Sequence, residues 1–181
     1  MDLEVLQEQA TNCTLCELYK GRNKAVFSRG NPGSDVVICG MCPGPDENKA
    51  GVPFIGAAGS VLDDVINNAF HTTTNIYITN LVKCFVQPGT KLIEEWMVRC
   101  LPYFVAQIHF VKPKVIIGLG GDVCNFLLAN DLKIGQMRGK EYDYMGAKFI
   151  PTYHPAFLAR GNRKRFFDIV VKDFEITLKF I

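Results

Sequence analysis

The stretch that decides the fold is VVICGMCPGPDENKAGVPFIGAAGSVLDDVI, residues 36–66. Its first three residues are apolar and β-branched, which predicts a buried strand. A loop rich in glycine and proline follows, and apolar residues at helical spacing predict a helix from about 59 to 69. A strand, a glycine-rich loop and a helix place backbone N–H groups at the carboxyl edge of a sheet, where open α/β sheets bind ligands. We therefore expect a binding loop around Asp46, Glu47 and an exposed Phe54, with an ordinary surface loop as the alternative.

This loop fits neither common nucleotide-binding motif. No Gly-Lys-Ser/Thr follows the strand, which excludes a Walker A loop, and Gly-x-Gly-x-x-Gly is absent from the turn. The rest of the chain continues the alternation of strand and helix. Strands are predicted near 76–80, 114–120 and 148–152, and helices near 2–11, 92–110, 121–129 and 162–179, with Pro102 expected to kink or split the helix that contains it. This order implies a mostly parallel sheet covered on both faces.

Length and composition are those of one globular domain over residues 1–181. Hydrophobic residues make up 48% of the chain and charged residues 21%. The net charge of +2 neither indicates nor excludes a nucleic-acid partner. No apolar run approaches the ~18 residues of a membrane span, and the acidic amphipathic N-terminus does not resemble a signal peptide. We therefore expect a cytoplasmic or nuclear protein in which seven cysteines serve metal or redox chemistry rather than disulfides.

Four of the cysteines have the spacing of a metal site. Cys13 and Cys16 form a Cys-x-x-Cys, and Cys84 and Cys100 follow with fifteen residues between them. Four thiolates can hold Zn²⁺ or a [4Fe–4S] cluster, and composition does not choose between them. The alternative for Cys84 and Cys100 is ordinary packing at a strand end and in a helix. Core packing is also expected for Cys39 and Cys124, whereas Cys42 lies inside the binding loop.

A second candidate loop follows the predicted strand at 148–152. His154 could reach the same crevice as Glu47 and Phe54. Phe157 and Leu158 are expected on an exposed loop beside Arg160, Arg163, Lys164 and Arg165. An apolar wedge flanked by cations suits a protein that unstacks a duplex and grips its phosphates. A helix N-terminus with a solvated basic face is an equally good interpretation of these residues alone.

Taken together, these motifs resemble the family 4 uracil-DNA glycosylases, the iron–sulfur branch of that superfamily. The resemblance covers nearly the whole chain, from Cys13 to the last helix. Its matching pieces are Cys13-x-x-Cys16, Gly40-x-x-Pro43-Gly44-x-x-Glu47, Gly51-x-Pro53-Phe54-x-Gly56-x-Ala58-Gly59, Tyr77-Ile78-Thr79-Asn80-x-Val82-Lys83-Cys84, Cys100 and His154-Pro155-Ala156-x-Leu158.

The resemblance implies an α/β fold, a three-layer α/β/α sandwich with a central four-stranded parallel sheet. It implies a [4Fe–4S] cluster on Cys13, Cys16, Cys84 and Cys100. It also implies a monofunctional DNA glycosylase of base excision repair, which flips uracil out of single- or double-stranded DNA and hydrolyses the N-glycosidic bond.

The resemblance also assigns roles to residues of the two loops. Phe54 would stack on the flipped base and Asn80 would read its edge, while His154 would stabilise the leaving uracil and Glu47 would position water. Gly40, Met41 and Cys42 would lie beside the base. Phe157, Leu158, Arg160 and Arg163 would contact DNA, with Leu158 filling the gap left by the flipped base.

One position departs from the family pattern. The family reads Gly-Glu-(Ala/Gly)-Pro-Gly where this chain has Gly40-Met41-Cys42-Pro43-Gly44, so Met41 replaces a carboxylate. A methionine cannot ionise, and loss of an active-site acid can cost orders of magnitude in rate. A second hypothesis is therefore a weakened or inactive module that binds uracil or a modified base, within replication machinery. The chain lacks the inserted loop of the covalently trapping relatives, and we expect no covalent uracil capture.

A third hypothesis is a small iron–sulfur redox or nucleotide-binding protein unrelated to DNA. It explains the cysteines but leaves Phe54, Asn80 and the His154 loop without a role. For the leading hypothesis we expect uracil-containing DNA as partner, no membrane, a cytoplasmic location and a monomer, or a place in a larger replication or repair assembly.

Overall fold

The computed structural model describes residues 2–70 and 75–181. The strands are β1 (Ser28–Gly30), β2 (Val36–Gly40), β3 (Ile76–Asn80), β4 (Val115–Leu119), β5 (Tyr142–Tyr144) and β6 (Ala147–Thr152). The helices are α1 (Leu3–Thr11), α2 (Pro45–Ala50), α3 (Ala57–Phe70), α4 (Glu94–Val111), α5 (Gly121–Leu128), α6 (Ile134–Met137), α7 (Pro155–Phe157) and α8 (Arg163–Glu175). Shorter or irregular turns are η1 (Glu17–Lys20), η2 (Leu158–Asn162) and η3 (Ile176–Lys179).

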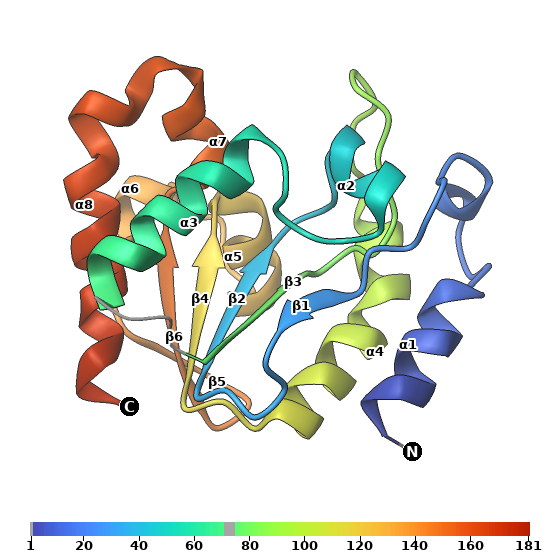
Figure 1. The fold of residues 1–181 in the computed structure, drawn as a ribbon, viewed down its shortest axis with the longest axis horizontal. Helices are drawn as coiled ribbons and strands as arrows, with labels where there is room; N and C mark the ends of the chain where they lie inside the picture. Colours follow the sequence, from blue (N-terminus) through green and yellow to red (C-terminus); the bar gives the residue numbers. More distant parts are fainter. Residues whose placement is uncertain (1, 71–74) are drawn as a thin grey trace.

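A single twisted sheet forms the centre of the molecule, with the order β1-β3-β2-β4-β6-β5 (Figure 1). The four inner strands are parallel, which confirms the expected fold class. Two short antiparallel strands, β1 and β5, were not predicted and pair with the outer parallel strands. They are only three residues long, too short to show an alternating pattern.

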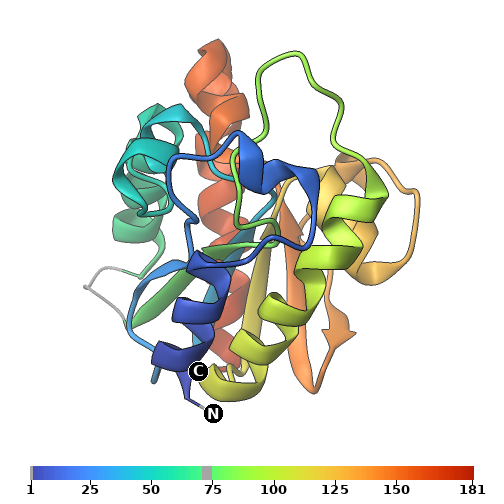
Figure 2. The same cartoon turned by 90° about the vertical axis from the view of Figure 1, so that its right-hand side faces the viewer.

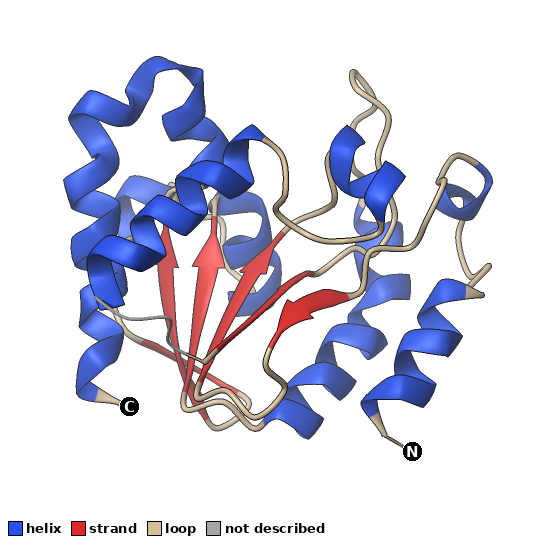
Figure 3. Ribbon diagram, in the orientation of Figure 1, coloured by secondary structure: helices blue, strands red, loops and turns tan. Residues whose placement is uncertain are grey.

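Helices cover both faces of the sheet, giving the expected three layers (Figures 1 and 3). Alternate residues of β2 enter different hydrophobic clusters: Val37 and Cys39 pack on the side of α4 and α5, and Val36 and Ile38 on the side of α3 and α8. Because both faces of this strand are buried, its sequence is an unbroken apolar run. Helix α1 packs on α4 outside these layers, as Figure 2 shows.

Two local expectations are wrong and one is refined. The loop after β2 contains the helix α2, which begins with Pro45 at its first position and ends at Gly51 with φ 81°. Pro102 does not split its helix, because α4 runs from Glu94 to Val111 with the proline inside. The last predicted helix is divided into α8 and η3. Within the described residues, no helix is long and apolar enough to cross a membrane.

The parallel strands all end at one edge of the sheet. Gly40 and Asn80 are paired at the ends of β2 and β3, and Leu119 and Thr152 at the ends of β4 and β6. The chain runs from β2 outward to β3 and then returns to the other side of β2, so the strand order reverses between β2 and β4. Open α/β sheets bind ligands beside such a reversal.

Candidate functional site

A cavity of about 350 Å³ opens at this edge, within the ~300–1,000 Å³ range of small-molecule sites. It brings together residues from three separate segments of the chain. Those expected from the sequence are Cys42, Glu47, Phe54, Asn80, His154 and Arg160. The lining residues that were given no individual role from the sequence are Pro43, Gly44, Pro45, Asp46, Gly56, Ala57, Ala58 and Ala156. Most of these are small. Asp46 belongs to the expected binding loop, and the family motifs contain Pro43, Gly44, Gly56, Ala58 and Ala156.

Phe54 forms one wall of the cavity, and the expectation that it is exposed is wrong. Only 5% of its surface is accessible, and its ring centroid lies 5.9 Å from that of His154. Its backbone has φ 55°, in the left-handed region. A Cβ on Gly40 would overlap the Phe54 ring, and one on Gly59 would overlap the Phe54 carbonyl. The two glycines of the motif therefore make room for this aromatic residue.

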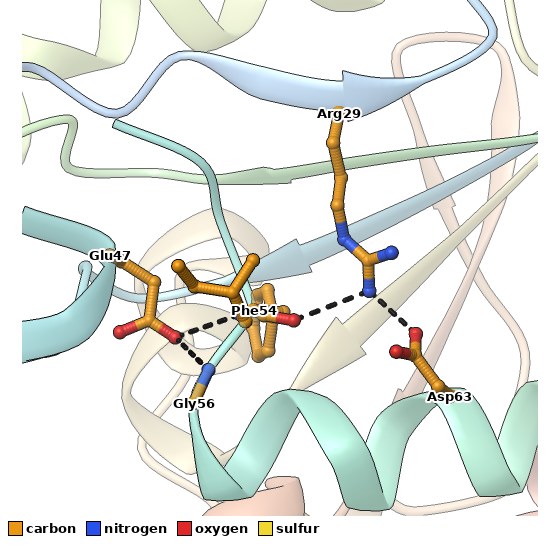
Figure 4. A network of polar contacts seen from close by, with 6 residues as sticks. Arg29, Glu47, Phe54, Gly56 and Asp63 are labelled. Atoms are coloured by element: carbon orange, nitrogen blue, oxygen red, sulfur yellow. Dashed lines mark hydrogen bonds and ion pairs between the residues drawn. The ribbon is translucent and has the colours of Figure 1, made fainter. Parts of the chain in front are cut away.

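Glu47 and Arg29 hold the Phe54 segment from opposite sides (Figure 4). Glu47 Oε1 accepts hydrogen bonds from the backbone N–H groups of Ile55, at 3.1 Å, and Gly56, at 3.0 Å. The Arg29 guanidinium donates to the Phe54 carbonyl at 3.4 Å and pairs with Asp63 at 2.6 Å. Arg29 was not predicted as part of the site, because nothing local in the sequence connects it to a residue 25 positions away. The contacts fix the loop and leave Glu47 Oε2 beside Gly44.

Asn80 lies at the floor of the cavity with an unsatisfied acceptor. The residue is 1% exposed, and its Oδ1 atom has no hydrogen-bond partner among the described residues. A Cβ on Gly40 would overlap this oxygen, so the amide lies directly against the end of β2. A buried acceptor without a partner costs about 1–3 kcal/mol. Its position in a cavity indicates that a ligand with a hydrogen-bond donor completes the site.

His154 follows β6 and caps α7. Its Nδ1 accepts a hydrogen bond from the Ala156 N–H at 3.1 Å. Burial, and to a smaller extent the nearby Arg160 guanidinium, lower the pKa of His154 to about 4, while Glu47 acts in the opposite direction. The ring is therefore neutral at physiological pH, and because Nδ1 is an acceptor the proton is on Nε2. This imidazole is a hydrogen-bond donor at Nε2.

Met41 is not among the residues that line the cavity. Its side chain belongs to the hydrophobic cluster on the α4 side of the sheet, with only 9% of its surface accessible. Strand β2 ends at Gly40. Beyond it, the backbone carbonyl of Met41 accepts a hydrogen bond from the Val82 N–H at 2.8 Å. The structure thus does not support base contact by the Met41 side chain, whereas Cys42 lines the cavity and Gly40 lies against Asn80 Oδ1 and the Phe54 ring.

The expected exposed wedge at 157–158 is a second correction. Leu158 is 1% exposed and packs in the cluster on the α3 and α8 side. Phe157 stacks with Tyr153 at 5.4 Å and meets Phe166 at 5.0 Å. The segment turns into η2 and α8, which covers both side chains, and the sequence gives no local sign of this packing. Arg160 is exposed at the cavity, and Arg163 pairs with Asp64 at 2.7 Å.

The four cysteines line a separate narrow cavity, together with the cations Arg22, Arg99 and Lys83. Cys84 Sγ accepts from the Arg22 guanidinium at 3.1 Å, and Cys100 Sγ from the Lys83 backbone N–H at 3.3 Å. Burial raises the pKa of Cys100 to about 11 and that of Cys84 above its ordinary value. Within residues 2–70 and 75–181, no three His, Cys, Asp or Glu side chains are arranged to hold a metal ion. The donor set nevertheless fits a sulfur-ligated group, since all four thiols face one cavity free of carboxylates.

Several known proteins similar to this chain are type-4 uracil-DNA glycosylases. A family model described as the uracil DNA glycosylase superfamily matches residues 27–175. The type-4 uracil-DNA glycosylase of Thermotoga maritima is 33% identical over 181 residues, covering 99% of this chain and 94% of that protein. The type-4 enzyme of Pyrobaculum aerophilum is 36% identical over 168 residues, covering 88% of this chain and 86% of the relative. A DNA polymerase of Bacillus phage SP01 is 26% identical over 160 residues, which are 17% of that protein. The chain therefore belongs to the uracil DNA glycosylase superfamily, and within it to the type-4 uracil-DNA glycosylases.

Proposed function

We propose that this protein excises uracil from DNA by hydrolysing the bond between uracil N1 and the sugar C1′. The observation that carries the proposal is the unsatisfied Oδ1 of Asn80, buried in a cavity with Phe54, His154 and Glu47. Uracil presents an N3–H donor to this acceptor, whereas cytosine presents a lone pair at N3 and leaves the acceptor unpaired. The family relationship supports the same substrate, because its relatives are named for uracil.

A base stacked in a duplex cannot reach the cavity, so uracil must be flipped out of the helix. Phe54 then offers a ring on which the base stacks. The Asn80 amide accepts from N3–H and donates to O4. These contacts hold the pyrimidine at the floor of the cavity with its O2 free to face His154.

Cleavage of the C1′–N1 bond leaves negative charge on uracil and positive charge on the sugar. The neutral His154 ring donates from Nε2 to O2, where the anionic charge develops, and acts as an oxyanion hole does. Glu47 Oε2 has no hydrogen bond among the described residues and is available to orient water and to favour the cationic sugar. The C1′–N1 bond breaks as the uracil anion leaves, and the oxygen of water bonds to C1′ and releases one proton to solvent. The uracil anion takes up a proton from solvent.

We further propose a [4Fe–4S] cluster on Cys13, Cys16, Cys84 and Cys100. The convergence of the four thiols on one cavity supports it, as do the Arg22 and backbone hydrogen bonds to sulfur. Burial disfavours free thiolates here, so bound iron would supply the positive charge that keeps them ionised. The cluster orders the segments that carry its ligands and takes no part in the hydrolysis.

DNA, single- or double-stranded, is the proposed partner. Arg160 at the cavity mouth and the nearby Arg163 are placed to contact phosphates. We do not assign the wedge role to Leu158, because its side chain is buried. A monomeric, cytoplasmic protein remains our expectation, as one domain over residues 1–181.

The second candidate function is a reader that binds uracil without releasing it. It is favoured by Met41, which stands where the family pattern has a carboxylate. The similarity to a segment of a phage DNA polymerase is compatible with such a domain inside a replication protein. Under this alternative the Asn80 contacts remain, and only the chemical step is lost.

Incubation with uracil-containing oligonucleotides, followed by alkaline cleavage, tests both functions. Strand cleavage above that of an Asn80→Ala control supports the enzyme. Cleavage no greater than that of the control contradicts the enzyme. Uracil-specific binding without base release supports the reader, and equal affinity for uracil- and thymine-containing DNA contradicts the reader. Met41→Glu belongs in the same series, with a thermal melt beside it, because a carboxylate placed in this hydrophobic cluster carries a burial cost.

A further inference from the structure

Lys83 is a fully enclosed lysine located between the base pocket and the cysteine cavity. Only 1% of the residue is accessible, and it lines the cavity of the four cysteines. Its ammonium donates hydrogen bonds to the Asn80 carbonyl, to Thr79 Oγ1 at 2.8 Å and to Gln107 Oε1 at 2.6 Å. An ammonium has three N–H donors, so this group is completely satisfied.

The network continues behind the lysine. Gln107 Nε2 donates to Tyr77 Oη at 2.9 Å and to the Phe27 carbonyl at 3.2 Å. Thr79 Oγ1 donates to the same carbonyl at 2.7 Å. The position of the Lys83 ammonium is therefore set by partners on β3, α4 and the segment before β1.

Stability alone does not account for a charge at this position. Moving an ammonium out of water costs several kcal/mol, and replacing buried charges by apolar residues of similar size is often neutral or stabilising. Of the three Lys83 acceptors, the Asn80 carbonyl belongs to the residue whose side-chain amide faces the base pocket, and Thr79 Oγ1 also approaches this carbonyl at 3.3 Å. Asn80 is the last residue of β3. The hydrogen bonds between β3 and β2 end directly after it, where the Leu81 N–H donates to the Gly40 carbonyl at 2.9 Å.

The same short turn joins the two sites. Residues 80–84 run from the amide in the base pocket to a cysteine of the second cavity, and the backbone N–H of Lys83 contacts Cys100 Sγ at 3.3 Å. The Lys83 side chain folds back over this turn and fixes the peptide that follows Asn80. The orientation of that peptide determines where the Asn80 side chain points.

We propose that Lys83 is a positioning residue, which orients the Asn80 amide for base recognition by holding its carbonyl from the cysteine side. The inference rests on the proposed function and adds a residue to its specificity. Loss of the ammonium lets the turn relax and displaces the Asn80 Oδ1 and Nδ2 atoms. A displacement of this kind is expected to lower kcat/KM for uracil on the order of a hundredfold and to reduce the preference for uracil over cytosine.

The test compares Lys83→Met with Lys114→Met in the full, iron-loaded protein. Lys114 is an exposed lysine that pairs with Asp35, so its replacement makes the same change in charge away from Asn80. Free uracil is titrated into each variant, with the ¹⁵N NMR signal of the Asn80 side-chain amide and the thermal melt recorded in parallel. Iron and sulfide content is measured to establish equal loading. Excision rates on uracil- and cytosine-containing DNA complete the comparison.

We expect Lys83→Met to load iron normally, to melt below wild type because three buried acceptors lose their donor, and to bind free uracil more weakly with a shifted Asn80 signal. Unchanged uracil affinity and selectivity overturn the inference. If Lys83→Met does not fold, the double variant Lys83→Met/Gln107→Met removes the ammonium together with the amide that accepts from it. Weaker uracil binding by this variant then supports the inference, and unchanged uracil affinity and selectivity overturn it. A wild-type protein that releases no uracil refutes the proposed function, whereas equal excision by wild type and Lys83→Met refutes only the inference.

Discussion

Replacing Glu47 separates two tasks that its carboxylate performs. Oε1 accepts from two backbone N–H groups, at 3.1 and 3.0 Å, and Oε2 is available to the reaction. Glu47→Gln keeps an oxygen at Oε1 and removes the charge, so the loop stays in place. We expect the melting temperature to remain close to that of wild type, and the single-turnover rate of uracil release to fall about 10²–10⁴-fold.

Glu47→Ala removes the loop contacts as well. Hydrogen bonds to charged groups contribute about 1.5–3 kcal/mol each, so losing two costs at least about 3 kcal/mol. At ~2–4 °C per kcal/mol for a chain of this size, the melt should fall by about 6–12 °C. A wild-type rate for Glu47→Gln refutes the catalytic role, and an unchanged melt for Glu47→Ala refutes the structural one.

The other predictions concern the base contacts, the histidine and the corrected wedge. Asn80→Asp replaces an amide by an acceptor-only group, which repels uracil O4, so uracil excision should be lost in the strand-cleavage assay while the melt shows a folded protein. Since the folded-state pKa of His154 is lowered to about 4, the unfolded chain binds more protons between about pH 6.5 and 4. The free energy of unfolding should therefore hold above pH 6.5 and decline as pH falls to 4, with His154→Gln lacking this dependence, whereas the excision rate of the folded protein should fall only as pH approaches 4. Leu158→Ala should lower the free energy of unfolding by about 2–5 kcal/mol in urea titrations, because the side chain is buried; an unchanged stability contradicts its placement in the core.

The parallel sheet could be predicted because its strands are apolar runs separated by helical patterns. Val36 to Ile38 contact both layers, and that burial is visible in composition alone. The edge strands β1 and β5 could not be predicted, since three-residue strands depend on their partners rather than on a pattern of their own. Helix α2 did carry its signals, Pro45 at the start and Gly51 just after the end, but the helix is only six residues long.

The residues that line the cavity were easiest to identify where they sit at a strand end. Asn80 ends β3 and His154 follows β6, and the shared edge of a parallel sheet brings them together. Side-chain direction was less accessible. Phe54 is buried because the chain adopts a left-handed conformation there, and Leu158 is buried because α8 folds over it. The burial of Phe54 and of Leu158 depends on contacts with residues of other elements. The hydrogen bond from Arg29 to the Phe54 carbonyl likewise joins residues far apart in the sequence.

The three segments of the cavity have a consequence for biosynthesis. One wall comes from residues 42–58, the floor from Asn80 and the opposite wall from residues 154–160. Chains emerge from the ribosome at about 5–20 residues per second, and parallel pairing between distant strands is slow to form. A nascent chain therefore completes its first two strands well before His154 is available. Activity should arise in a single late step, and chaperones rather than the substrate will encounter the unfinished pocket.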